Sequence, residues 1–294
     1  MLNPPTSGEL VGSRAEGLLL GLALGEATPT SHGGNPGLRL TWQAVAVAEA
    51  LLAHGQPQPA DLLPRWLAVS QTISERPGSI TGEALRLFRR GLADPELAPA
   101  VATMMPGRSG DAPLSRCLPI AIAARESGVT LRRWVRRCTS ATHAEPISQL
   151  AALAAAMLAR DLLSRPLEDC LPRVAQALRE DSPESFTAIL HAPRPGAGMP
   201  DGDDASGVLA AAVQALCEGR DWAETVAIAA SRGVAGDSAP ALAGALAGAR
   251  WGVAALPEVN LRQLPSPLRA RLSQLAWDLL SLQRELMAPV PGRA

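Results

Sequence analysis

Apolar positions recur with the period of an α-helix along nearly the whole chain. In residues 41–54, for example, Ala44, Val47 and Leu51 fall on one helical face, and the pattern stops at Gly55. Further segments with the same period are 14–25, 59–72, 81–92, 118–126, 131–138, 147–163, 167–180, 208–218, 222–231, 240–256 and 267–287. Short segments rich in Pro, Gly and Ser separate them, and β-branched runs of period two are missing. The pattern therefore predicts an all-α fold.

One predicted helix consists almost entirely of small residues. In 242–249, Gly244 and Gly248 are four residues apart and so lie on the same helical face. Small side chains allow neighbouring backbones to approach closely. We therefore expect this segment to be a central, tightly packed helix.

The composition excludes several classes of protein. Hydrophobic residues make up 47% of the 294 residues and the net charge is only −1, which together exclude intrinsic disorder. A charge balance so near to neutral makes nucleic acid an unlikely partner, because no long-range field would steer it to the protein. All 27 basic residues are arginine, so chemistry that needs a lysine Schiff base is also excluded.

The sequence predicts a soluble, cytoplasmic protein that is not embedded in a membrane. The longest apolar stretch, 150–159, is too short to span a bilayer, and a basic segment typical of a signal peptide is missing from the start. The cysteines form no C-x-x-C pair, and we expect buried free thiols rather than a zinc site or disulfides. These cysteines are Cys117, Cys138, Cys170 and Cys217.

One stretch is locally basic. Arg132, Arg133, Arg136 and Arg137 would share one side of a helix around Trp134. Such a stripe could hold an anionic ligand. The simpler interpretation is a solvated face that acidic residues from elsewhere neutralise.

Five segments, taken in chain order, resemble motifs of the ADP-ribosylglycohydrolase family, of the dinitrogenase-reductase-activating glycohydrolase type. Segment 17–27 is similar to G-x-L-x-G-x-A-x-G-D-A, and 38–52 to T-D-D-T followed by A-L-A-E-S-L-L. Segment 110–119 is similar to G-N-G-A-L-M-R-x-A-P, and 140–146 to S-A-x-T-H-x-x-P. Segment 233–252 is similar to G-G-D-T-D-T followed by A-G-A-L-A-G-A-x-Y-G. The resemblance implies one ADP-ribosylglycohydrolase-like domain over 1–294, folded as a compact orthogonal bundle of many helices.

The resemblance also implies a binding site. Members of the family hold two Mg²⁺ or Mn²⁺ ions in a cleft between the T-D-D and D-T-D-T motifs, and the ions orient the ribose and activate the attacking water. The positions carried over by the resemblance as substrate-binding are Gly110, Asp111, His143 and Gly236. The expected partners are ADP-ribose or an ADP-ribosylated protein.

The metal motifs depart from this pattern. Leu38, Arg39 and Leu40 stand where T-D-D is expected, and Ala235 replaces the first Asp of the later motif. The residual metal-ligand candidates are Asp237 and Ser238, for which helix capping is the alternative role. Divalent cations need several oxygen ligands, so no cofactor can be assigned with certainty and the two-metal activity is expected to be lost or strongly altered.

Three functional hypotheses remain open. The first is a family member that binds a nucleotide-sized ligand without the two-metal hydrolysis. The second is an active hydrolase whose metal ligands have moved, with the acidic loop 201–204 as their source, although helix capping is the simpler role of that loop. The third is a structural or interaction module without catalysis. The convergence of Glu26, Asp111 and this loop near Asp237 is the geometric condition for the second.

Overall fold

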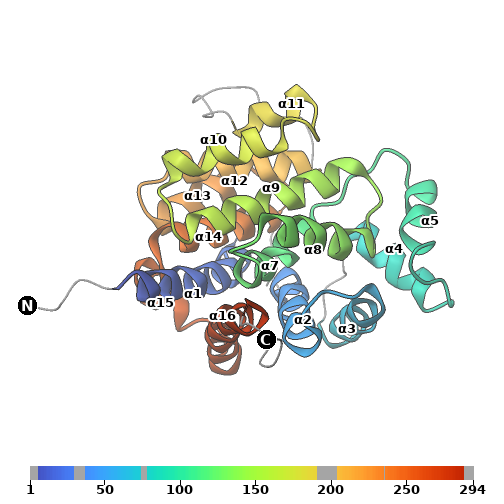
Figure 1. The fold of residues 1–294 in the computed structure, drawn as a ribbon, viewed down its shortest axis with the longest axis horizontal. Coiled ribbons are helices and arrows are strands. Elements are labelled where there is room, and N and C mark those ends of the chain that lie inside the picture. Colours follow the sequence, from blue (N-terminus) through green and yellow to red (C-terminus); the bar gives the residue numbers. More distant parts are fainter. Residues whose placement is uncertain (1–5, 30–36, 74–77, 191–203, 235, 288–294) are drawn as a thin grey trace, which may run out of the picture.

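The computed structural model describes residues 6–29, 37–73, 78–190, 204–234 and 236–287. Within these ranges every regular element is a helix, which confirms the all-α prediction (Figure 1). The α-helices in chain order are α1 (Ser7–Glu26), α2 (Arg39–His54), α3 (Pro59–Thr72), α4 (Ser79–Phe88), α5 (Leu97–Met104), α6 (Ala112–Arg116), α7 (Leu118–Ala123), α8 (Gly128–Ser140), α9 (Pro146–Leu162), α10 (Leu167–Leu178), α11 (Glu184–Thr187), α12 (Ala205–Glu218), α13 (Trp222–Ser231), α14 (Ser238–Trp251), α15 (Glu258–Leu261) and α16 (Ser266–Met287). Two short 3-10 helices, η1 (Ala188–Leu190) and η2 (Val253–Ala255), complete the set.

Most predicted helices are present, and the differences lie at helix ends and in short elements. Helices α3 and α13 have the predicted bounds, whereas α1 begins seven residues earlier than the apolar pattern suggested, at Ser7 rather than at residue 14. Thr6 and Glu9 explain this start, because they form a reciprocal capping box with Glu9 N donating to Thr6 Oγ1 at 3.3 Å and Thr6 N donating to Glu9 Oε2 at 2.7 Å. Helices α5, α6, α11 and α15 were not predicted, because segments of four to eight residues are too short to show a helical period.

Helices α1 and α14 form the central pair of the fold, and their backbones touch. A methyl group added at Gly248 would lie 1.9 Å from the carbonyl oxygen of Gly17, and one added at Gly21 would lie 2.2 Å from that of Gly244. The glycines of both helices thus meet in two reciprocal pairs. The expectation of a central, tightly packed helix at 242–249 is confirmed.

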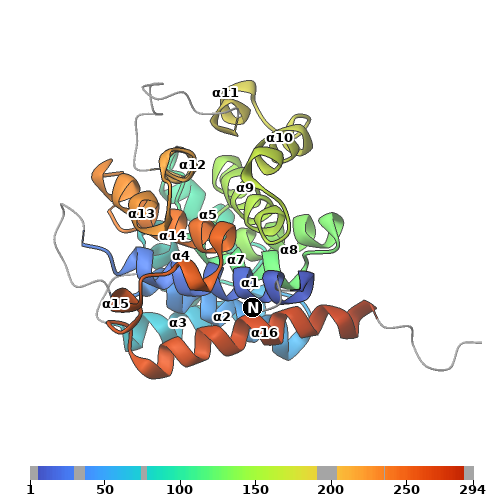
Figure 2. The ribbon, with the colours of Figure 1, turned by 90° about the vertical axis from the view of Figure 1, so that its left-hand side faces the viewer.

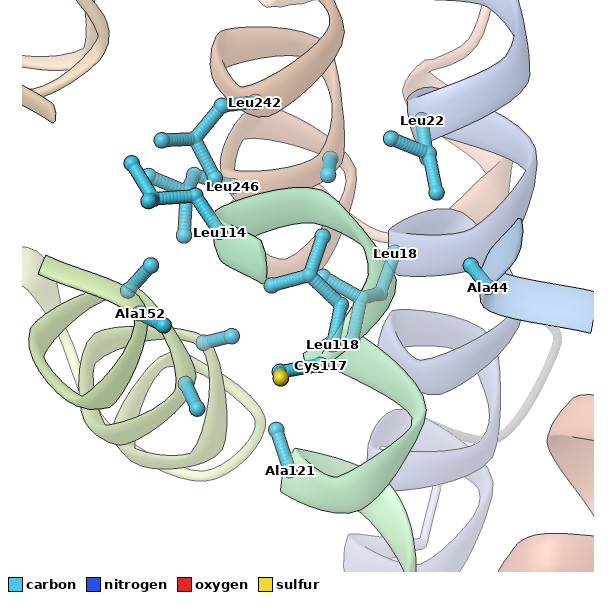
Figure 3. Close-up of a cluster of buried hydrophobic side chains, with 14 of the residues drawn as sticks. Leu18, Leu22, Ala44, Leu114, Cys117, Leu118, Ala121, Ala152, Leu242 and Leu246 are labelled. Carbon is cyan, nitrogen blue, oxygen red and sulfur yellow. The ribbon is translucent and has the colours of Figure 1, made fainter. Parts of the chain in front are cut away.

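Leucine and alanine side chains from several helices fill the core around this pair. Figure 3 shows Leu242 and Leu246 of α14 beside Leu114 of α6, with Leu18 and Leu22 of α1 on the other side of α14. Cys117, Cys138 and Cys170 are buried free thiols, as predicted. Cys217 is exposed, so the prediction was wrong there, because the residue lies near the end of α12 on its outer side.

Two of the four arginines in the stripe of α8 share one acidic partner. Asp181, which follows α10, lies 2.8 Å from Arg132 and 3.7 Å from Arg136. This contact supports the interpretation of a solvated face neutralised by an acid from elsewhere. Among the described residues, no helix is long and apolar enough to span a membrane.

The fold brings three helix ends together. The end of α1 contacts the start of α2 through Glu26, and the start of α2 contacts the start of α14 through Arg39. Helix α16 runs beneath α1 and α2, on the far side of α1 from α9 and α10 (Figure 2). The segments with family-like motifs therefore converge on one region.

Candidate functional site

Glu26, the last residue of α1, is fully buried and holds the start of α2. Its Oε1 accepts a hydrogen bond from Leu40 N at 2.7 Å, and its Oε2 accepts from Thr41 N at 2.8 Å and from Thr41 Oγ1 at 2.7 Å. The first N–H groups of a helix need such acceptors, and a carboxylate also complements the positive end of the helix dipole. Burial nevertheless raises the pKa of Glu26 to about 7, against the opposing effect of these hydrogen bonds.

Leu38 cannot serve as this cap, because its side chain has no polar atom. It occupies the N-cap position of α2 with φ of 58° and ψ of 38°, in the left-handed region that costs a branched residue free energy. In the described part of the chain it is the only non-glycine residue with positive φ. The strained turn directs the chain into α2 immediately before Arg39.

Arg39 reaches from the start of α2 to the start of α14. Its Nη2 lies 2.7 Å from Asp237 Oδ1 and 3.4 Å from Ser238 Oγ, and its side chain is only 13% exposed. Burial acts to lower the pKa of Arg39, but the negative charges of Asp237, Asp111 and Glu26 outweigh it and raise the pKa. The Arg39 guanidinium therefore pairs with Asp237 and is within electrostatic reach of two further acidic residues of the family-like motifs, Asp111 and Glu26.

Asp237 is directed to Arg39 rather than to its own helix. It stands at the N-cap position of α14, yet its side chain makes no capping hydrogen bond. The capping role considered from the sequence is therefore wrong for this side chain. Gly236, just before it, has φ of 57°, a left-handed conformation that favours glycine.

Gly110 and His143 come together from the third and fourth motifs. A methyl group added at Gly110 would lie 2.5 Å from His143 Nε2, so the glycine lets the imidazole approach the backbone. His143 Nδ1 lies 2.7 Å from Thr142 Oγ1. Burial, aided by the positive charge of Arg116, lowers the pKa of His143 well below its usual value, so the ring is neutral at pH 7.

Arg116 is a buried cation that the motif contained but the sequence analysis did not assign. Its Nη2 donates to Thr142 Oγ1 at 2.5 Å, its Nη1 lies 3.4 Å from Thr81 Oγ1, and its guanidinium carbon lies 4.1 Å from the centre of the Trp66 ring. These partners are neutral, and among the described residues its Nε has no hydrogen bond. The signal that could have identified it is the arginine of the G-N-G-A-L-M-R motif. Burial of a charged side chain costs free energy, so an arginine within a short, mostly apolar segment indicates a specific role.

The acidic loop is described only from Asp204 onward; the predicted ligands Asp201 and Asp203 lie outside the described residues. Asp204 caps α12, because its Oδ1 accepts from Gly207 N at 2.8 Å and from Ser206 Oγ at 2.7 Å. Its Oδ2 lies 3.2 Å from Ser109 Oγ, so Asp204 is close to the residue that precedes Gly110. The expected capping role of Asp204 is confirmed.

The oxygen atoms around Arg39 do not form the set of ligands that a divalent cation requires. A metal ion bound by Asp237 would have to share its carboxylate with the guanidinium, which already takes Oδ1, and both oxygens of Glu26 already accept helix N–H groups. Hard cations take six or more oxygen ligands, or retain several waters. In the described ranges, no group of three or more His, Cys, Asp and Glu side chains could hold a metal ion.

Comparisons with known proteins agree with these motifs. The family model described as ADP-ribosylglycohydrolase matches residues 7–288. A solved structure titled "ADP-ribosylglycohydrolase-related protein complex" is similar at 28% sequence identity with a TM-score of 0.76, over 93% of this chain and 99% of that chain. No curated protein matches the sequence. The chain belongs to the ADP-ribosylglycohydrolase family.

Proposed function

We propose that this protein binds ADP-ribose or a related nucleotide in the cleft of one family domain spanning 1–294, and that its two-metal hydrolase centre is lost. The observation that carries the proposal is the 2.7 Å ion pair between Arg39 and Asp237. The guanidinium supplies a permanent positive charge to the residual carboxylates. The protein therefore does not need a divalent cation to compensate them.

The donors of this region do not fit a two-metal centre. Two divalent cations beside Arg39 would place about five positive charges against the three carboxyl groups of Asp237, Asp111 and Glu26. The attraction to these groups would not offset the repulsion between the cations and the guanidinium. Ser238 adds only a neutral hydroxyl, which already lies 3.4 Å from Arg39 Nη2. We accordingly assign Asp237 and Ser238 to the arginine rather than to a metal ion.

Ligand binding is supported by polar groups that remain beside this ion pair. Among the described residues Nη1 of Arg39 is buried without a hydrogen-bond partner. A buried N–H group that donates to no acceptor lowers the stability of the protein, and a ligand oxygen could accept from it. A phosphate or ribose oxygen of a nucleotide is such an acceptor. Gly110, Asp111, His143 and Gly236 are the proposed contacts around it.

Hydrolysis provides the first test. The purified full chain is incubated with ADP-ribosylated protein in the presence of Mg²⁺ or Mn²⁺, and released ADP-ribose is measured by chromatography. We expect no release above the level of a sample without protein. Metal-dependent release would overturn the proposed loss of the hydrolase centre and would favour relocated metal ligands.

Binding is tested separately by isothermal titration calorimetry with ADP-ribose, in buffer containing EDTA. We expect saturable 1:1 binding that weakens about tenfold or more in Arg39→Ala, because a charged hydrogen-bond donor is lost. Arg262→Ala is the matched control, since Arg262 is an exposed arginine whose one ion-pair partner among the described residues is Glu258, four residues before it. No heat with the unaltered protein would instead favour a structural or interaction module.

A further inference from the structure

A polar pocket lies away from Arg39 and Asp237. Arg125, Arg160, Arg165 and Arg173 line it, together with Glu126 and Asp161, and its volume is about 450 Å³. We refer to it as the arginine pocket. This volume falls within the range of small-molecule binding pockets.

The arginine pocket and the proposed cleft stand at opposite ends of α1. Ser7, the first residue of α1, lines the pocket, whereas Glu26, the last, contacts α2. A rise of 1.5 Å per residue separates the two ends of α1 by roughly 28 Å. A ligand in the pocket is therefore distinct from one beside Arg39.

The pocket carries an excess of positive charge. Asp161 is buried and shared by two arginines, with Oδ1 at 2.6 Å from Arg160 Nη2 and Oδ2 at 3.4 Å from Arg173 Nε. Arg125 pairs with Glu126 at 3.1 Å. Among the residues that line the pocket, four arginines thus stand against two carboxylates, a formal excess of two positive charges.

The arginines are not needed to complete the end of helix α9. The carbonyl of Leu162 accepts from Arg14 Nη1 at 3.0 Å, and that of Asp161 accepts from the backbone N–H groups of Ser164 and Arg165. The last acceptors of the helix are therefore already satisfied. The arginines that line the pocket are therefore not required as donors to these two carbonyl groups.

Two of these guanidiniums present donors toward the pocket. Arg160 is held in place through Nε and Nη2 by Asp161, and in the described structure its Nη1 makes no hydrogen bond. The side chain of Arg165 has neither an ion pair nor a hydrogen bond among the described residues. Both guanidiniums thus carry spare N–H donors, and that of Arg160 is also fixed by a buried carboxylate. Such groups suit a phosphate, which accepts two parallel hydrogen bonds from one guanidinium.

We propose that the arginine pocket is a second binding site, for a small soluble molecule that carries one or two phosphate groups. The two excess positive charges match a phosphate dianion, and the volume of about 450 Å³ leaves room for an organic part. This site does not depend on the nucleotide cleft proposed above.

Titration calorimetry of the full chain with inorganic pyrophosphate, in EDTA and low salt, tests the proposal. We expect saturable binding that weakens about tenfold in Arg165→Gln and in Arg173→Gln. Arg165 has no partner to lose, so its variant is expected to fold normally, which thermal unfolding would verify. Arg262→Gln removes the same charge elsewhere and is expected to leave the affinity unchanged.

Three outcomes would overturn the arginine pocket as a site for a soluble phosphate ligand. One is the absence of binding up to millimolar pyrophosphate. Another is binding that survives both pocket variants but is lost in Arg39→Ala, which would locate the phosphate in the nucleotide cleft. Cosedimentation with phosphatidic acid vesicles that pyrophosphate does not compete would also contradict a site for a soluble ligand.

Discussion

Arg39 and Asp237 are 198 residues apart in the chain, and their side chains meet at 2.7 Å. Each belongs to a segment that resembles a metal-binding motif of the family. In this protein the two segments are joined by an ion pair between side chains that are 13% and 22% exposed. The pair gives the start of α2 and the start of α14 a direct link.

Arg39→Ala should reduce the free energy of unfolding by about 2 kcal/mol, because it leaves Asp237 without its partner in a largely buried position. Urea denaturation followed by circular dichroism measures the change. Arg262→Ala removes an exposed ion pair and should change stability by less than about 0.5 kcal/mol. Equal effects of the two variants would mean that the Arg39 pair contributes no more than a surface contact.

Arg39→Asp should create a dependence on divalent cations that the unaltered protein lacks. The variant adds a carboxyl group at residue 39 close to Asp237 and within electrostatic reach of Asp111, and it removes the guanidinium that pairs with Asp237. Mn²⁺ should therefore raise its Tm by several degrees in differential scanning fluorimetry. The unaltered protein and Arg39→Ala are the controls. An equal rise in the unaltered protein would contradict the proposed replacement of metal by arginine.

Stability should fall as the pH rises from about 4.5 to about 7, in part through Glu26. Its pKa is 4.5 in a model compound and about 7 in the folded protein, so across this window the folded state holds a proton that the unfolded state has lost. The free energy of unfolding then decreases with rising pH and levels off above pH 7. Urea denaturation of Glu26→Gln should show a shallower slope in this window. An unchanged slope would assign the pH dependence to other groups.

Gly248→Ala should destabilise the protein by about 3 kcal/mol or more, because the new methyl group would lie 1.9 Å from the carbonyl oxygen of Gly17 and would force α1 and α14 apart. Gly8→Ala is the matched control, since no atom lies within 4 Å of the added methyl group. It should stabilise α1 by about 0.5 kcal/mol. Thermal or urea denaturation measures the stability of both variants. A loss of stability in Gly248→Ala alone would come from the close packing of α1 and α14, whereas an equal loss in both would come from the glycine-to-alanine change itself.

One thiol should react much faster than the other three. Cys217 is exposed, whereas Cys117, Cys138 and Cys170 are buried. Desolvation by nearby protein atoms raises the pKa of Cys217, so its reaction with Ellman's reagent should still be slower than that of a free thiol and should accelerate at higher pH. Cys217→Ser should remove the fast phase. Two or more fast thiols in the native protein would contradict the buried positions.

The sequence by itself determined the helical fold and the family, because both follow from features that are local or ordered along the chain. The period of apolar positions predicted α3 and α13 with their observed bounds, and the small residues of 242–249 predicted the close packing of α14. The segments similar to the family motifs kept their order over the range that the family model matches. Short helices such as α6 were not predicted from the apolar period, because five residues contain little more than one helical turn.

Only the tertiary structure decided what the unusual residues of the motifs do. The sequence placed an arginine where an acid was expected, but it could not show that this arginine would reach Asp237 from another helix. Nor could it show that Glu26 caps the start of α2, because the cap that Leu38 cannot provide comes from the end of α1. The arginine pocket likewise joins α1, α9 and α10 with the residues after α7. Such contacts depend on how helices pack, and packing is set by all of the buried surfaces together rather than by any one segment.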